Sequence, residues 1–197
     1  MIENLLLATA RASLENATRS GPPMIVPDEA LASFPHQARK KSAAYVSIWR
    51  WPQMDPRASH GFHQPDEPLI NAVAKAARGC ALHETVFPRL KPEELSNIII
   101  RVHLIGERKP LETTGGAIPE GNALFLEYKA HSAVFLHEVA ELAGWDIQEA
   151  ASQLCLKAGL PGDMWLSTDV KLMLAPVRII EEEAPGRNPL IGEAGNG

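Results

Sequence analysis

The chain has 197 residues, a formal net charge of −5 at pH 7 and apolar residues at 45% of positions, which is ordinary usage for a globular protein. An isoelectric point near 5.8 argues against nucleic acid as a partner, because nucleic-acid-binding domains usually carry a basic surface. No run of about 18 apolar residues occurs, so no membrane-spanning helix is expected.

The two cysteines, Cys80 and Cys155, lie far apart in apolar segments and form no C-x-x-C pair. This spacing excludes a zinc finger and favours buried thiols in a reducing compartment. The amino-terminal segment lacks the basic residues of a signal peptide. We therefore expect a cytoplasmic protein, and nothing in the sequence calls for a cofactor.

Apolar positions three and four residues apart predict a helix over residues 2–17. A proline-rich connector over 20–37 precedes a strand over 43–49, in which Tyr45 and Ser47 alternate with apolar residues. Residues 51–67 contain proline, aspartate, histidine and glycine and few apolar residues, which predicts a loop.

A second helix is predicted over 68–82, and a single helical turn over 91–95 begins with a proline in its first turn. The clearest strand is 97–106. Its alternation places Ile98, Ile100, Val102 and Leu104 on one side. The other side carries His103, which either lines a pocket or faces solvent, and we favour solvent.

Glycines and prolines make 111–122 a turn-rich excursion, and another strand is predicted over 123–128. Helices are predicted over 134–143 and over 147–158, the second with Asp146 as its cap. A last extended segment covers 169–180.

Strands and helices follow one another without regular β-α-β alternation. This order favours an α+β fold with a largely antiparallel, mixed sheet flanked by helices. We expect one domain over 1–182 and a flexible tail over 183–197, which is rich in glycine and proline.

Three stretches carry a resemblance to a known family. The first runs from Trp145 to Trp165, and matches the pattern gWd…ee…L…lc.KAGLp…W of the AMMECR domain family with the same spacing. The matching positions are Trp145, Asp146, Glu149, Leu154, Cys155, Lys157, Ala158, Gly159, Leu160, Pro161 and Trp165.

The second stretch, Pro68 to Leu95, resembles the family's pL…v…A..AA..D.RFpPL..eEL without a gap, with Glu84 at the family's aspartate and Val86 at its arginine. In the third, the hallmark LRGCIG falls on residues 56–61, read here as P-R-A-S-H-G. Only Arg57 and Gly61 are kept, and Ser59 replaces the hallmark cysteine.

The resemblance covers roughly residues 2–182 and implies an α+β fold in two lobes. The family's biochemical role is poorly defined, so activity is not implied. Its bacterial and archaeal members often accompany Memo-type and radical-SAM proteins, which implies such proteins as pathway partners.

The 56–63 segment is the predicted ligand site, because loops on rigid scaffolds often carry function. Arg57, backbone N–H groups and His63 form a candidate site for a small anion, and the alternative is a purely structural turn. Ser59 can act as a nucleophile only beside a base, for which His60 and His63 are the nearest candidates in sequence. Glu84 is a candidate partner for Arg57, and the alternative is an ordinary exposed charge.

Two more positions complete the predicted chemistry. Lys157 lies at the end of a helix, where it either favours the helix terminus by its charge or reaches a ligand. His137 and Glu141 have the spacing of two ligands in an H-E-x-x-H zinc motif. The resemblance argues against zinc there, so the pair is interpreted as a surface contact and no metal site is predicted.

Three functions stay open. A small-ligand-binding or accessory protein predicts a cleft near 56–63 with convergent Arg and His. An enzyme that modifies a small metabolite or a protein side chain predicts a perturbed His, Glu or Ser in that cleft. A protein–protein adaptor predicts an exposed apolar patch. The missing cysteine favours the first.

Overall fold

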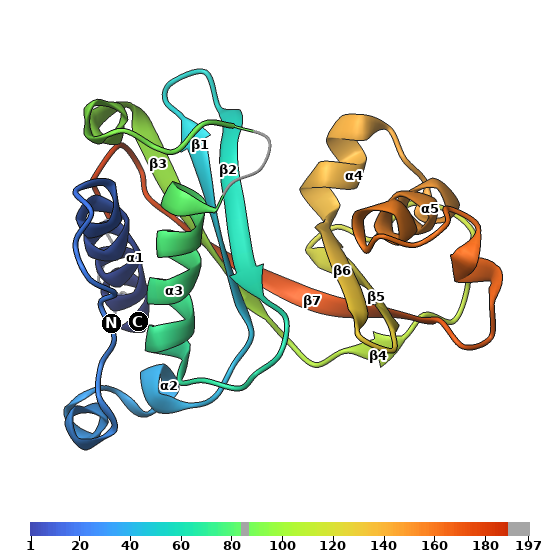
Figure 1. Ribbon diagram of the computed structural model, residues 1–197, viewed down its shortest axis with the longest axis horizontal. Helices are drawn as coiled ribbons and strands as arrows, with labels where there is room; N and C mark the ends of the chain where they lie inside the picture. The colour runs from blue at the N-terminus through green and yellow to red at the C-terminus, as the bar shows by residue number, and fades with distance from the viewer. Residues whose placement is uncertain (84–86, 189–197) are drawn as a thin grey trace, which may run out of the picture. The chain divides into compact units, whose positions relative to one another are not determined.

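A computed structural model describes residues 1–83 and 87–188. The chain divides into two compact units. Unit 1 comprises residues 1–104 together with the carboxy-terminal segment from Ile179, and unit 2 comprises residues 105–178 (Figure 1). Nowhere in the two described ranges is a helix both long and apolar enough to cross a membrane.

The elements of unit 1 match most of the predicted ones. In chain order they are α1 (Ile2–Thr18), the 3₁₀ helix η1 (Asp28–Ser33), α2 (His36–Arg39), β1 (Ala44–Arg50), β2 (Asp55–Phe62), α3 (Leu69–Leu82), the 3₁₀ helix η2 (Pro92–Asn97) and β3 (Ile98–Ile105). The helices predicted over 2–17 and 68–82 and the strands predicted over 43–49 and 97–106 are confirmed within about two residues.

Strand β1 is the central strand of the unit 1 sheet. It pairs antiparallel with β2 on one side and with β3 on the other. Helices α1 and α3 lie together on one face of these strands (Figure 1). Because side chains alternate along a strand, every second residue of β1 and β3 points to these helices.

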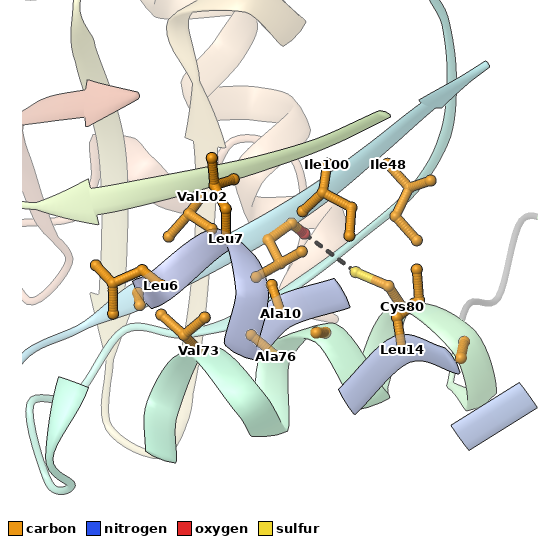
Figure 2. Packing of buried hydrophobic residues seen from close by; sticks show 14 of the residues in the cluster. Leu6, Leu7, Ala10, Leu14, Ile48, Val73, Ala76, Cys80, Ile100 and Val102 are labelled. Carbon is orange, nitrogen blue, oxygen red and sulfur yellow. Dashed lines mark hydrogen bonds between the residues drawn. The ribbon is translucent and has the colours of Figure 1, made fainter. Parts of the chain in front are cut away.

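The core of unit 1 forms between the two helices and the sheet. Figure 2 shows side chains from both helices and the sheet packed together: Leu6, Leu7, Ala10 and Leu14 of α1, Val73, Ala76 and Cys80 of α3, and Ile48, Ile100 and Val102 of the sheet. Small residues on both helices allow close approach. The Cys80 thiol donates to the Val46 carbonyl at 3.1 Å, so it is a buried packing residue.

The loop predicted over 51–67 is wrong over its central part, because residues 55–62 form β2. The strand was not predicted because these residues are mostly polar, and the prediction of strands relied on alternating apolar residues. The segment is a strand because β1 offers its free edge, and an edge strand tolerates polar residues on its exposed side. The predicted site is therefore on a sheet.

The end of β7 (Lys171–Glu181) and the residue after it return to unit 1. Glu182 is almost fully buried, where it accepts from the Ile100 backbone N–H at 2.9 Å and pairs with Arg11 of α1. Arg11 also donates to the carbonyls of Leu95 and Ile98, both at 3.0 Å. This ion pair joins α1, β3 and the carboxy-terminal segment.

Unit 2 has its own core, formed on the strands that follow β3. Its remaining elements are β4 (Lys109–Pro110), β5 (Asn122–Tyr128), β6 (His131–Leu136), α4 (His137–Ala143), α5 (Ile147–Lys157) and the 3₁₀ helix η3 (Met164–Leu166). Strand β5 pairs antiparallel with β6 and with β7, and β4 pairs with β7. Helix α5 contributes Ala150, Leu154 and Cys155 to the core.

The helix predicted over 134–143 begins three residues later than expected. Residues 131–136 form β6, since each pairs with a residue of β5, and tertiary pairing overrides local preference there. The helix predicted over 147–158 is confirmed. Its first turn has the expected cap, in which the Asp146 side chain accepts from the Glu149 N–H at 2.8 Å.

The predicted α+β class, with a largely antiparallel sheet flanked by helices, is confirmed. The flexible tail predicted over 183–197 falls partly on residues 189–197, which lie outside the described residues. Residues 183–187 form a hydrogen-bonded turn, with the Glu183 N–H donating to the Arg187 carbonyl at 2.9 Å.

Candidate functional site

The predicted site segment lies on the face of the unit 1 sheet that is turned away from α1 and α3. The register aligns Ser59 of β2, Ser47 of β1 and Arg101 of β3 in one row across the strands. Directly opposed side chains on one face lie within about 5.5 Å of each other at Cβ. The exposed Ser59 therefore adjoins the buried Ser47, with the half-buried Arg101 beyond it.

The next row of the same face contains Gly61, Tyr45 and His103. The Tyr45 ring occupies the space beside Gly61, where an added Cβ would lie 2.4 Å from the ring. Gly61 is therefore required by the close approach of Tyr45, which is a structural reason for this position.

His103 is fully buried, so the expectation that it faces solvent is wrong. Its Nε2 lies 2.8 Å from Ser47 Oγ, and the Trp49 indole N–H donates to the same oxygen at 2.9 Å. Since Ser47 already accepts from Trp49, its own hydrogen is best placed toward Nε2. The ring hydrogen then sits on Nδ1, which has no hydrogen-bond partner among the described residues.

Burial, together with the nearby positive charge of Arg101, lowers the pKa of His103 to about 4. The imidazole is therefore neutral at pH 7. A base this weak is poorly matched to removing a proton from a serine hydroxyl. His103 is accordingly a fixed, neutral acceptor of the hydrogen bond from Ser47.

Arg57 occupies a bulge in β2, because Ile48 pairs with Ala58 and Trp49 with Pro56 and the residue between them is extra. Its guanidinium is buried against the Phe87 ring at 5.5 Å. Nε and Nη2 donate to the two Glu94 carboxylate oxygens at 2.8 and 3.0 Å, and Nη2 also donates to the Pro88 carbonyl at 2.9 Å.

The carboxylate partner of Arg57 is therefore Glu94, from a different segment than expected. Partial burial raises the pKa of Glu94, but hydrogen bonds from Arg57 and from the Lys91 backbone N–H outweigh it and hold the pKa below its usual value. Glu84, the predicted partner, lies outside the described residues. Arg57 Nη1 has no hydrogen-bond partner in the described part of the chain.

His60 points to the opposite side of β2 from Ser59. Its ring lies against α3 at Gly79, where an added Cβ would be 2.0 Å from His60 Cδ2, and it contacts the Phe62 ring edge-on at 5.7 Å. The side chain that adjoins Ser59 in sequence is thus directed to the helix layer, and alternation along β2 is the reason.

His63 and Gly61 line a cavity of about 210 Å³ at the end of β2. Gln64, Asp66, Glu67 and Ala72 complete most of its wall. His63 Nδ1 lies 3.4 Å from the Tyr45 hydroxyl. Of the predicted site residues that the structure describes, only Gly61 and His63 line this cavity. Arg57, Ser59 and His60 are not part of its wall.

Lys157 belongs to unit 2. Its Nζ donates to the Val134 carbonyl at 3.0 Å and lies 4.7 Å from the centre of the Phe135 ring. Lys157 thus holds the end of α5 against β6. These contacts give a structural reason for lysine at this position.

His137 and Glu141 make the surface contact expected of them, with His137 Nδ1 3.9 Å from a Glu141 carboxylate oxygen. Across residues 1–83 and 87–188, no three His, Cys, Asp or Glu side chains are grouped as metal ligands.

The sequence interpretation missed Ser47, Trp49 and Arg101, which together with His103 form the polar rows beside Ser59. A signal was present in the alternation of Tyr45 and Ser47 with Val46 and Ile48. It shows that a polar face exists, but it does not show which strands lie beside β1, and so the contacts between rows remained hidden.

Comparison with known proteins shows the family and the fold of this chain. A protein of Thermococcus gammatolerans is 32% identical over 198 residues, covering 94% of this chain and 95% of the relative, and one of Thermococcus onnurineus is 34% identical with the same coverage. The crystal structure of an uncharacterised protein of Pyrococcus horikoshii matches with a TM-score of 0.78 and 29% identity over 92% of each chain. The family model named AMMECR1 matches residues 7–178, and the chain belongs to the AMMECR1 family.

Proposed function

We propose that this protein binds a small ligand in the cavity formed by Gly61, Phe62, His63, Gln64, Asp66, Glu67 and Ala72. The supporting observation is the cavity itself, which lies at the end of the strand that carries the family hallmark position. A volume of about 210 Å³ suits a small metabolite or one part of a larger one.

Binding is favoured over acyl transfer because the three histidines considered as bases in this part of unit 1 have other packing or hydrogen-bonding roles. The His60 ring packs on α3, and His63 lies beside Tyr45. His103 is held by Ser47 and has a pKa of about 4, which makes it a weak proton acceptor. Activation of a serine hydroxyl requires a base with a pKa nearer the working pH.

The wall of the cavity indicates the ligand class. Asp66 and Glu67 bring negative charge to its mouth, Gln64 and His63 add polar atoms, and Phe62 and Ala72 are apolar. Glu67 pairs with Lys75, which leaves Asp66 as the carboxylate with the stronger influence on a ligand. A small amine with a short apolar body fits this lining better than the anion expected from sequence.

The test measures binding of short alkylamines and of the carboxylic acids of equal length by isothermal titration calorimetry. We expect the amines to bind and the acids not to bind. Replacing Asp66 by asparagine should weaken amine binding about 10-fold, because one charge-assisted hydrogen bond is worth about 1.5–3 kcal/mol.

Asp55→Asn is the matched control, since Asp55 is an exposed carboxylate at the other end of the same strand. It should leave amine affinity unchanged. Preferential binding of the acids, or an equal loss in both variants, would show that the cavity does not hold an amine.

A cytoplasmic location is also part of this proposal. It is supported by Cys80 and Cys155, which are both buried free thiols, as proteins of reducing compartments usually have. The Memo-type and radical-SAM partners implied by the family resemblance stay a prediction.

A further inference from the structure

Unit 2 contains a second and larger cavity, of about 620 Å³, beside the turn-rich segment between β3 and β5. Its volume is within the range of small-molecule sites. All of its lining residues belong to unit 2, so it is separate from the cavity at the end of β2.

Backbone hydrogen bonds fix the segment that forms the wall. The Gly106 N–H donates to the Pro176 carbonyl at 2.8 Å, and the Leu111 N–H donates to the Leu172 carbonyl at 2.9 Å. The Ile147 N–H at the start of α5 donates to Gly116 at 2.8 Å. The wall is held at several points along its length, and a preformed wall reduces the ordering cost of binding.

The floor and the rim of this cavity differ in character. Leu111, Ile147 and Leu174, which are buried or half-buried, provide an apolar floor, and the exposed prolines 110, 119 and 176 complete the apolar part of the lining. The rim carries the exposed Glu107, Lys109 and Glu112. Within the described residues these three side chains make no ion pair, whereas their neighbour Arg108 pairs with Glu127.

We propose that this cavity binds a small zwitterion with an apolar body, the chemistry of an apolar free amino acid. The apolar floor removes the body from water, at about 25 cal/mol per Å² of buried apolar surface. Lys109 attracts the carboxylate, and Glu107 and Glu112 attract the ammonium group. A ligand with both charges satisfies a rim with both signs, and one with a single charge leaves part of the rim unpaired.

The test titrates the full-length protein with L-leucine, with leucinamide, which lacks the carboxylate, and with N-acetyl-leucine, which lacks the ammonium group. Binding is followed by amide chemical shifts of Gly115 and Ala117 in the cavity wall. We expect L-leucine to bind at least 10-fold more tightly than either derivative. Equal or tighter binding of a derivative, or no shift with any probe, overturns the proposal.

Charge variants at the rim test the roles separately. Lys109→Gln should weaken L-leucine binding about 5-fold and leave leucinamide affinity unchanged, while Glu112→Gln should weaken both. Lys171→Gln and Glu120→Gln are exposed controls in unit 2 outside the lining, and neither should change affinity. Affinities that fall equally in controls and rim variants contradict the assigned contacts.

The Asp66→Asn variant separates this proposal from the amine site of unit 1. It should weaken alkylamine binding in the small cavity about 10-fold and leave L-leucine binding unchanged. Loss of L-leucine binding in Asp66→Asn would place the ligand in unit 1 and overturn the assignment to unit 2, whatever the outcome for alkylamines.

Discussion

His103 loses its charge when the protein folds, and stability should therefore depend on pH. Its pKa falls from 6.5 to about 4 in the folded protein, so between these values the unfolded chain binds more protons than the folded one. The free energy of unfolding should then rise with pH across this window, by at most about 3 kcal/mol. Stability is full above pH 6.5 and is lost as the pH falls toward 4.

The measurement is urea denaturation from pH 4 to pH 7. His103→Gln should remove about one proton from the slope of stability against pH between 4.5 and 6.5, while the exposed His36→Gln should keep it. Glu94 also loses stabilisation in acid, since its folded pKa is lowered, but only as the pH falls through the range below its ordinary value of 4.5. An unchanged slope in His103→Gln would show that the pKa of His103 is the same in the folded and the unfolded protein.

Arg57 should matter more for stability than its position in the family hallmark suggests. It is 4% exposed and binds Glu94 through two hydrogen bonds. Arg57→Ala should lower the free energy of unfolding by about 3 kcal/mol, and Arg57→Lys should recover less than half of this, because lysine lacks the planar fork that binds both oxygens.

Arg50→Ala is the control, because Arg50 also lies over the Phe87 ring, with its Cζ at 5.4 Å, but is half-buried. Its loss should cost about 1 kcal/mol or less. Thermal or urea unfolding measures all three variants. Equal effects of Arg50→Ala and Arg57→Ala would mean that the ring contact dominates and the carboxylate pair contributes little.

Among the elements, β2 shows where sequence patterns fail and why. The strands at 44–50 and 98–105 and the helices at 2–18 and 69–82 each bury one apolar face, so their periodicity predicts them. Strand β2 contributes only Ala58 to the core cluster. Its other residues are polar or glycine, apart from Pro56 and Phe62, which are exposed near its two ends. What makes it a strand is the hydrogen-bonding edge of β1, which is a tertiary property.

The same reasoning explains the outcome at the candidate site. The sequence identified Gly61 and His63, which line the small cavity. It did not identify Ser47 as the partner of His103, because that contact crosses from β1 to β3, more than fifty positions apart in the chain. The alternation of residues along one strand shows which side chains share a face of the sheet. Which strands lie side by side, and so which polar side chains meet and are buried, depends on the order of the strands in the sheet.

The end of β7 should be an important stabilising element for unit 1. Removing the carboxylate of Glu182 leaves Arg11 and the Ile100 N–H without their partner in a buried setting. Glu182→Ala should lower the free energy of unfolding by about 3 kcal/mol. Glu183→Ala, at the adjacent and exposed position, should change it by about 0.5 kcal/mol or less. Similar losses in both would show that the buried ion pair adds nothing beyond local turn structure.

At the scale of the whole molecule, the two units have separate cores and each contains one buried cysteine. Cys80 lies in the core of unit 1 and Cys155 in that of unit 2. Burial raises the pKa of the Cys155 thiol, which suppresses its reactivity in the folded state. The rate of thiol modification at each position therefore reports how often the surrounding unit opens.

We expect Cys155 to react first. Two long helices pack on the unit 1 sheet, whereas unit 2 has one helix of 11 residues and a shorter one of seven, and so buries less apolar surface. With Cys80→Ala and Cys155→Ala variants, each leaving a single thiol, labelling by a disulfide reagent in increasing urea should give an opening free energy at least about 1 kcal/mol lower for Cys155, or roughly a fivefold difference in rate. Identical protection of the two thiols would mean that the units unfold as one cooperative structure. A lower opening free energy at Cys80 would place the weaker core in unit 1, against the burial argument.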